Sequence, residues 1–149
     1  MFLGTYEHSM DAKGRTSLPA KFREILQSRY DGRLILTVNF DSSGSCLVGY
    51  PFASWEELAG KYAQLSPFDP NAIRLRRLHV GSATEVDIDK QGRVLIPPPL
   101  REYAQLEREV VWAGNLGVLE LWSKARWQDE QKKTRDELPA IMQSLAGKV

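Results

Sequence analysis

Hydrophobic and polar positions along this chain change period several times, and each period predicts a different element. The run Leu34-Ile35-Leu36-Thr37-Val38 is aliphatic and β-branched, which is typical of a buried strand. A polar loop at residues 41–45 and a return strand at residues 46–50 complete a predicted hairpin. Apolar residues at 3,4,3 spacing then predict an amphipathic helix opened by Pro51, with the stripe Trp55, Leu58, Tyr62 and Leu65.

Two further helices are predicted in the first half and at its end. Pro19 suits the first position of a short helix, because proline there gives up no hydrogen bond and has a suitable φ. Residues 71–80, beyond the break at Pro67–Pro70, are predicted to form a connecting helix. The first helix is marked by the spacing of Phe22, Ile25 and Leu26, and the second is expected to have partly buried apolar residues at Ile73, Leu75 and Leu78.

The second half repeats the order of the first. A strand is predicted at Thr84–Ile88, followed by a turn, a short strand, a helix led by Pro97 and a hairpin around residues 114–117. The last helix starts near Ser123 and is polar from residue 128 to 137, which favours an exposed, ion-paired surface. After Pro139 comes an apolar tail, which is expected to pack on the core or on a neighbouring subunit: Ile141, Met142 and Leu145.

One motif accounts for this repetition. Residues 11–23 and residues 89–101 share Asp, Gly, Arg, an aliphatic residue, Pro and a final Arg at a constant offset of 78 positions. Two copies are too few for a solenoid, but they suit two half-domains related by a pseudo-two-fold axis. We therefore predict a first repeat at residues 1–66, a connecting segment at 67–78 and a second repeat at 79–149.

Composition and charge narrow the class of protein. A chain of 149 residues with 42% hydrophobic and 26% charged residues is typical of a globular protein, and no apolar run approaches the length of a membrane span. Neither a basic nor a long apolar segment opens the chain, so we expect no secretory signal and a cytoplasmic location. The net charge is only +1. Binding to nucleic acid would therefore depend on local basic clusters, of which residues 11–33 form the larger and residues 74–79 the smaller.

The repeated turn carries the candidate chemistry. The carboxylates of Asp11 and Asp89 can accept hydrogen bonds from backbone N–H groups two or three residues on, and Gly14 and Gly92 permit the tight geometry. A rigid turn that presents arginine and lysine suits phosphate contacts and, for arginine, bidentate contact with guanine. The alternative is an Asp–Arg ion pair that only braces a hairpin. The basic residues concerned are Lys13, Arg15, Lys90 and Arg93.

These features together resemble the MraZ family of bacterial transcriptional regulators. The resemblance rests on the opening Met-Phe-x-Gly, on both Asp-x-x-Gly-Arg motifs with their Leu-Pro or Ile-Pro ends, and on a tryptophan-bearing helix after each hairpin. It implies an α+β fold of two tandem AbrB-like swapped-hairpin half-domains, with a pseudo-two-fold β core and short flanking helices. It also implies DNA contact through the Asp-x-x-x-Arg motif of each copy, namely Asp11 with Arg15 and Asp89 with Arg93.

The resemblance further implies partners and a location. Family members assemble into homo-oligomeric rings and bind short direct repeats of double-stranded DNA in the promoter of the division and cell-wall gene cluster, which places this chain at the nucleoid. Arg15 is expected to matter more than Arg93, because Lys13, Lys21 and Arg23 make its surroundings more basic. The alternative function is a ring-forming scaffold, or an antitoxin-like partner of another protein, without DNA readout.

An enzyme is not expected. His8 and His79 are the only histidines, and neither lies in a spacing that holds a metal. Cys46 is the only cysteine, which excludes an intramolecular disulfide and a cysteine-rich zinc site. Neither a phosphate-binding loop nor a Gly-x-Ser-x-Gly motif is present. We therefore expect no catalytic residue, cofactor, metal, small-molecule substrate or membrane partner.

Overall fold

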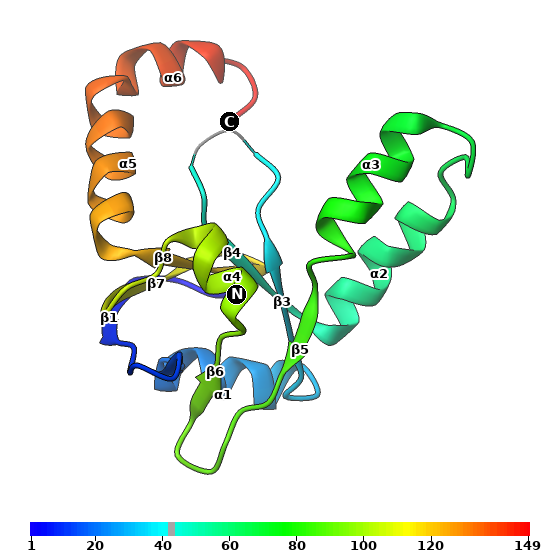
Figure 1. The fold of residues 1–149 in the computed structure, drawn as a ribbon. Coiled ribbons are helices and arrows are strands. Elements are labelled where there is room, and N and C mark those ends of the chain that lie inside the picture. Colours follow the sequence, from blue (N-terminus) through cyan, green and yellow to red (C-terminus); the bar gives the residue numbers. More distant parts are fainter. Residues whose placement is uncertain (42–43) are drawn as a thin grey trace.

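The structure, a computed structural model, describes residues 1–41 and 44–149 and is built on an antiparallel sheet (Figure 1). The strand order is symmetric about the middle of the sheet. Counted inward from either edge, equivalent strands of the two repeats occupy the same places. Each edge strand pairs with the hairpin of the other half. In order, the strands are β1 (Thr5–Ser9), β7 (Glu109–Asn115), β8 (Val118–Ser123), β4 (Leu47–Pro51), β3 (Leu34–Val38) and β5 (Thr84–Val86).

A separate two-stranded ribbon joins the two copies of the motif. Strand β2 (Arg15–Ser17) pairs antiparallel with β6 (Arg93–Leu95), and Thr16 lies opposite Val94. Thr16 and Val94 are 78 positions apart, so the pseudo-two-fold axis passes between them. The ribbon is extended symmetrically, because the Leu18 N–H donates to the Gly92 carbonyl at 2.9 Å and the Ile96 N–H to the Gly14 carbonyl at 2.8 Å. The two repeats thus exchange strands and form an α+β pseudo-dimer in one chain.

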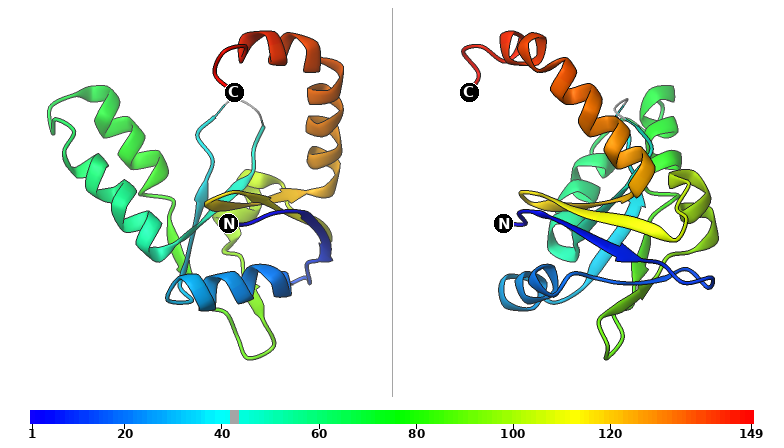
Figure 2. Two further views of the ribbon diagram at one scale, coloured as in Figure 1. Left: turned by 180° about the vertical axis from the view of Figure 1, so that it is seen from behind. Right: turned by 90° about the vertical axis from the view of Figure 1, so that its left-hand side faces the viewer.

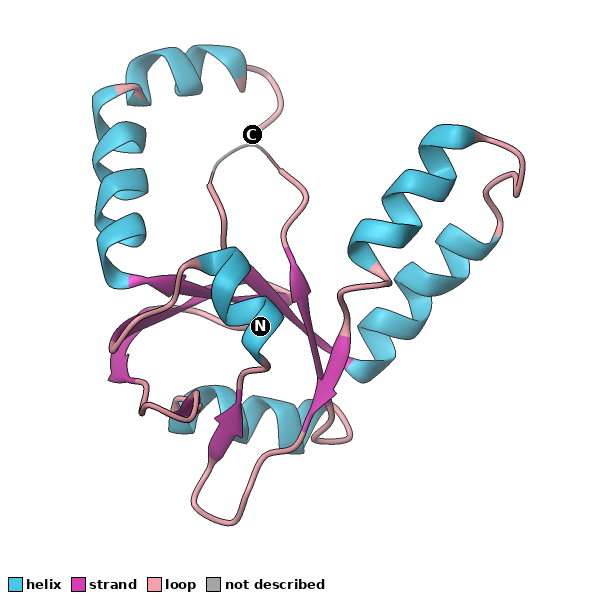
Figure 3. Ribbon diagram, in the orientation of Figure 1, coloured by secondary structure: helices cyan, strands magenta, loops and turns pink. Residues whose placement is uncertain are grey.

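The helices follow the same duplication. In Figures 1 and 3 two helical pairs project from the end of the molecule opposite the ribbon, one after each hairpin. Their bounds are α2 (Phe52–Ala63) with α3 (Pro70–His79), and α5 (Lys124–Asp136) with α6 (Leu138–Ser144). Figure 2 shows the two remaining helices packed close to the sheet: α1 (Ala20–Arg29) and α4 (Pro98–Ala104).

The core lies between the sheet, the ribbon and helices α1 and α4. Trp112 of β7 is fully buried at its centre, and Phe2 packs edge-to-face on Phe22 at 5.6 Å between ring centroids. Leu18 and Ile96, which follow the ribbon in each copy, are also fully buried. Because these apolar residues sit directly beyond Arg15–Ser17 and Arg93–Leu95, core packing fixes the position of the ribbon.

Several predicted details differ from the observed fold. Pro19 and Pro97 are N-caps rather than first helical residues, because each keeps an extended ψ of 137° or 147° while its carbonyl accepts the first helical hydrogen bonds. Leu78 is exposed, and the buried residues of α3 are Ala72 and His79. Residues 42–43 of the predicted loop at 41–45 lie outside the described residues.

Helices α5 and α6 have the exposed surface that their polar sequence predicts. No residue of α5 or α6 is buried, and one ion pair within the polar stretch, Lys132 with Asp136, forms at 3.0 Å. Met142 and Leu145 of the apolar tail are exposed, so the tail does not pack on the core of its own chain. Within the described part of the chain, no helix is long and apolar enough to cross a membrane.

Candidate nucleic-acid interface

The first turn is organised by a single carboxylate. One oxygen of Asp11, Oδ1, accepts hydrogen bonds from the backbone N–H groups of Lys13 and Arg15, both at 2.9 Å. The other, Oδ2, accepts from Nε of Arg15, also at 2.9 Å. The backbone donors are two and four residues on, rather than two or three, because Gly14 at φ +89° folds the chain back sharply. Asp11 therefore shapes the turn and orients the arginine at once.

The second turn repeats this arrangement. Oδ1 of Asp89 accepts from the N–H groups of Gln91 and Arg93 at 2.8 and 2.9 Å, and Oδ2 accepts from Nε of Arg93 at 3.1 Å. Gly92 has a φ of +80°, close to that of Gly14. Local geometry at Asp11–Arg15 and Asp89–Arg93 is the same, as the duplication predicts.

Both turn carboxylates are stabilised in their charged form. The backbone N–H of Arg15, followed by its side-chain hydrogen bond, holds the pKa of Asp11 below its ordinary value. In the same way, the backbone N–H of Arg93 lowers the pKa of Asp89. Hydrogen bonds to the ionised form have this effect wherever they occur. Each aspartate is therefore ionised at neutral pH and able to hold its arginine.

Each ion pair uses only one of the nitrogen atoms of its arginine. Arg15 and Arg93 contact their aspartates through Nε, and the side chain of each is 38% exposed. Within the described residues, no hydrogen bond is found for the terminal amino groups of either guanidinium. An arginine that is oriented through Nε, and whose terminal amino groups have no partner among the described residues, matches the geometry that reads phosphate or guanine. The brace and the contact are therefore compatible roles for the same side chain.

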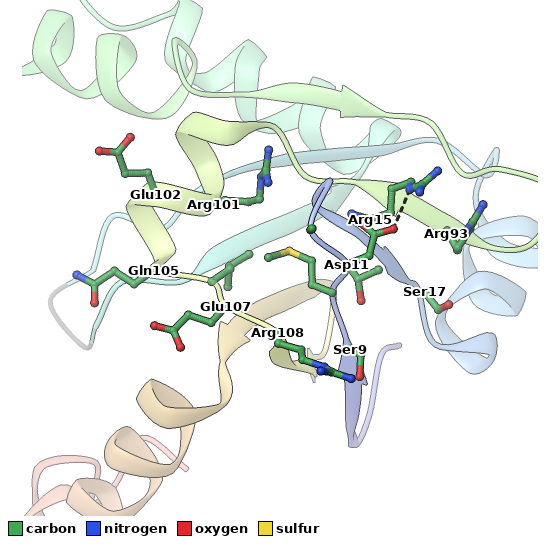
Figure 4. A pocket seen from close by; sticks show the side chains of 14 residues that line it. Ser9, Asp11, Arg15, Ser17, Arg93, Arg101, Glu102, Gln105, Glu107 and Arg108 are labelled. Carbon is green, nitrogen blue, oxygen red and sulfur yellow. Dashed lines mark hydrogen bonds and ion pairs between the residues drawn. The ribbon is translucent and has the colours of Figure 1, made fainter.

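The ribbon brings the two arginines onto one face. Arg15 lies opposite Leu95, and Ser17 lies opposite Arg93. Because side chains alternate along a strand, these four residues share the outward face, while Thr16 and Val94 are buried on the other. Figure 4 shows Arg15 and Arg93 on neighbouring strands with Ser17 close by. Sequence reasoning missed Ser17 and Leu95, although their place two residues after each arginine was the available signal.

A second pair of arginines, Arg23 and Arg101, packs on the turns, each on the turn of the opposite repeat. The side chain of Arg101 lies over Gly14 and that of Arg23 over Gly92, so close that a β-carbon on either glycine would collide with it. Nε of Arg23 donates to the Leu18 carbonyl at 3.2 Å, whereas Nε of Arg101 is buried with no hydrogen-bond partner among the described atoms. The final arginine of each motif therefore packs across the pseudo-two-fold axis.

The two lysines are exposed but not equivalent. At the offset of 78, Lys13 matches Gln91 and Lys90 matches Ala12, so each turn presents its lysine at a different position. Neither lysine forms an ion pair within the described residues. Both are therefore available to an anion, but from different points of the turn.

The wider basic clusters are dispersed in the fold. Arg33 forms a two-point contact with Glu85, at 2.6 Å from Nη2 and 3.2 Å from Nε, and stacks on Phe52. In the smaller cluster Arg76 donates to the Tyr62 carbonyl. Residues 11–33 and 74–79 thus contribute fewer free cations than their sequence predicts, and the turns remain the main basic feature of the ribbon.

The surface is concave beside each turn, and the two hollows differ in the charges that line them. The hollow beside Asp11, of about 1120 Å³, is lined by arginines from three elements together with Glu102 and Glu107 (Figure 4). The corresponding hollow beside Asp89 contains the Arg33–Glu85 pair and the additional acids Asp31 and Asp87. Asp87 stands where the first copy has Ser9. The first turn therefore offers anions the more favourable surroundings.

The remaining candidates for chemistry are structural. His79 is fully buried and contacts the Tyr62 hydroxyl through Nδ1 at 2.8 Å, and burial lowers its pKa. Cys46 is also buried, and burial raises the pKa of its thiol, which makes it unreactive. Among the described residues no group of three or more His, Cys, Asp or Glu is placed to hold a metal ion.

Comparison with known proteins identifies relatives across nearly the whole chain. Residues 1–78 and 80–146 match a family model whose description names the MraZ protein and adds, as a conjecture, that it is antitoxin-like. The transcriptional regulator MraZ of Thermomicrobium roseum is 43% identical over 146 residues, with 98% of each chain covered. That of Acidithiobacillus ferrooxidans is 41% identical over 129 residues, with 85% of each chain covered.

Among solved structures, the solution structure of PHS018 from Pyrococcus horikoshii is 15% identical, with a TM-score of 0.34 over 81% of this chain and 88% of that one. This likeness is too weak to carry an argument. The family model, by contrast, matches both copies of the turn motif and the hairpins that follow them, and the two regulators are more than 40% identical over most of the chain. On that basis the chain belongs to the MraZ family.

Proposed function

We propose that this chain is a transcriptional regulator that binds double-stranded DNA through the outward face of its β2–β6 ribbon. The observation that carries the proposal is the pair Arg15 and Arg93, each held through Nε by an aspartate and each with terminal amino groups that form no hydrogen bond within the described residues. Two-stranded ribbons fit the major groove of B-DNA, where arginine makes bidentate contacts with guanine. Membership of the MraZ family, whose curated relatives are described as transcriptional regulators, supports the same function.

Each residue of the turns has a proposed role. Arg15 and Arg93 contact bases, and Lys13 and Lys90 contact the phosphates on either side. Asp11 and Asp89 act indirectly, because their hydrogen bonds hold the arginines in place. Gly14 and Gly92 give the turns their geometry and leave room for the arginine of the opposite repeat.

The proposal extends to assembly and target. A subunit with a net charge of +1 has a weak field, whereas several ribbons on one ring add their contacts through effective concentration. Exposed apolar side chains on α6, including Met142, offer a surface for subunit contact. We therefore propose a homo-oligomeric ring that binds short direct repeats in the promoter of the division and cell-wall gene cluster, at the nucleoid. Light scattering at micromolar concentration tests the ring, and a monomer that still binds DNA would contradict it.

The second candidate is a scaffold or an antitoxin-like protein partner. It has one specific observation in its favour, since the family's description includes the antitoxin likeness. We favour DNA binding because a pure protein scaffold gives no reason for two aspartates to orient two exposed arginines on one ribbon face. In neither function do we assign a catalytic residue, a cofactor or a metal.

The deciding experiment is a gel shift of the full-length protein with its own upstream DNA at two salt concentrations. Binding that rests on phosphate contacts must weaken steeply as salt rises. Wild type should bind this fragment in preference to an unrelated one, and the double variant Arg15→Ala with Arg93→Ala should not. Lys61→Ala is the surface control that should bind as wild type does, because it removes an exposed positive charge on α2, at the end of the molecule opposite the ribbon. Equal binding by the folded double variant would return both arginines to a bracing role.

A further inference from the structure

Leu95 is an unusual residue on the ribbon face. Its side chain is 54% exposed, and among the described residues it is the one large apolar side chain within a strand that is exposed. Other exposed apolar residues in the described chain lie in loops, helices or at the ends. An aliphatic residue left in solvent between two arginines gains nothing from burial in the fold, which points to a role in contact with something else.

The position of Leu95 is fixed by the register of the ribbon. It lies directly opposite Arg15 and two residues from Arg93, on the same outward face. The pseudo-two-fold axis relates Arg15 to Arg93 but relates Leu95 to Ser17. The arginine pair is therefore symmetric, and the Leu95 and Ser17 positions are where the face loses its symmetry.

We infer that Leu95 is a specificity-determining residue that contacts the C5 methyl group of a thymine in the major groove, beside the base pair read by Arg15. This inference rests on the proposed function of the ribbon and names a feature of its DNA target. The thymine methyl is the apolar group that the major groove offers, and aliphatic side chains recognise it by packing. Ser17 has no apolar surface of that size and can only form a hydrogen bond at the matching position.

The spacing of the ribbon agrees with this assignment. Residues directly opposite each other in an antiparallel pair have β-carbons about 5 Å apart, and stacked base pairs are about 3.4 Å apart. Side chains of Arg15 and Leu95 that extend from neighbouring points can therefore reach adjacent base pairs. The surrounding arginine donors bind phosphates or guanine edges and leave the methyl contact to Leu95.

A consequence is that one chain reads DNA in one direction. A symmetric ribbon would prefer an inverted repeat, because the two halves would then make identical contacts. With leucine on one side and serine on the other, the two halves of the site differ, and the bound protein has a defined orientation. Copies of such a site arranged head to tail would bind subunits that all face the same way.

The test uses DNA duplexes with a randomised centre, selected by the full-length wild-type protein. The selected duplex is then remade with each thymine in turn replaced by deoxyuridine, which removes only the methyl group. Wild type should lose affinity about four-fold at one position, since one buried methyl group contributes about that factor. Leu95→Ala should bind the parent duplex more weakly and show no further loss at that position. Ser17→Ala, the matched control from the other half, should keep the methyl dependence.

The other outcomes overturn the inference in distinguishable ways. If methyl removal has no effect at any position while Arg15→Ala still abolishes binding, the role of Leu95 is wrong and the proposed function stands. If no duplex is enriched and Arg15→Ala behaves as wild type, both fail. If Leu95→Ala changes the oligomeric mass in sedimentation, Leu95 belongs to a subunit contact instead. Because Leu95 is exposed, the variant is expected to fold, and circular dichroism confirms this.

Discussion

The turns at Asp11–Arg15 and Asp89–Arg93 have the same hydrogen bonds but different neighbours. Their carboxylate contacts agree to within 0.2 Å, and both glycines have a positive φ. Around this shared frame, Ser9 is replaced by Asp87 and Ser17 by Leu95, and the two lysines occupy different positions. Backbone geometry depends on a few residue types, so it survived duplication, while the exposed positions around it were free to diverge.

The crossing arginines differ in a similar way. Arg23 donates a hydrogen bond to the Leu18 carbonyl over the second turn, whereas Nε of Arg101 over the first has no partner among the described residues. The Arg33–Glu85 pair adds further charge compensation beside the second turn. The arginine side chains around the first turn therefore form fewer hydrogen bonds and ion pairs than those around the second. This difference is the basis for expecting the two copies to contribute unequally to binding.

The largest effect should come from removing the arginines one at a time. Arg15→Ala is expected to cost about 1–3 kcal/mol of DNA affinity per engaged site, and in a ring this loss multiplies across subunits. Arg93→Ala should cost less, because the turn that holds Arg93 has the additional acids Asp31 and Asp87 beside it. Operator affinity of the folded, oligomeric single variants is the measurement. Equal losses would show that the surroundings do not matter, and a larger loss from Arg93→Ala would reverse the comparison.

Substitutions of the two turn glycines test how much the backbone geometry of each turn contributes to stability. Gly14→Ala and Gly92→Ala should each lower the free energy of unfolding by about 1–2 kcal/mol, because an L-residue is strained at positive φ. Gly92→Ala should be the worse of the two, since the new β-carbon meets Arg23, which a hydrogen bond to the Leu18 carbonyl holds in place, whereas no hydrogen bond of Nε holds Arg101 among the described residues. Denaturant unfolding measures both. Gly60→Ala, which meets no neighbouring atom, is the control, and an identical cost at 14 and 92 would argue against a role for the Arg23 hydrogen bond.

The lysines should have a smaller and less specific effect. Lys13→Ala is expected to weaken binding to all sequences alike and to reduce the slope of log affinity against log salt by about 1 for each engaged site. Lys90→Ala should do the same from its different place in the turn. A salt titration with specific and unrelated duplexes makes the measurement. If Lys13→Ala changed sequence preference and left the salt slope intact, we would have to assign it a base contact.

The smallest effect concerns acid. The pKa values of Asp11 and Asp89 are both lowered by hydrogen bonds in the folded state, so each contributes stability above its unfolded pKa. That contribution is lost as the pH falls from the ordinary value near 3.8 through the lower folded pKa. Because the frames match, carboxyl NMR titrations of the full chain should give similar midpoints for the two groups, both below 3.8. A normal midpoint for either aspartate would show that its turn is not formed in solution.

Much of the fold was accessible from the sequence because the duplication is explicit. The constant offset predicted matching elements, and the structure has them in the predicted order. The Asp–Arg ion pair, which the sequence offered as an alternative interpretation of the motif, forms in both copies, because its partners lie within a few residues of each other. Errors arose where burial depends on distant segments. Leu78 was predicted to be partly buried, but His79 takes the interior position, because Tyr50 and Tyr62 from two other elements surround it. The boundaries of the repeats at residues 66 and 79 stay predictions.

The sequence by itself determined the turns. An aspartate, a glycine and an arginine at fixed short spacing are sufficient for the hydrogen bonds of each turn, because every partner is local. Only the tertiary structure decided what faces each turn. The pairing of Arg15 with Leu95, and the packing of Arg101 over Gly14, join segments that are about half the chain apart. A register between such segments is set by how the core packs as a whole, and no local pattern of residues specifies it.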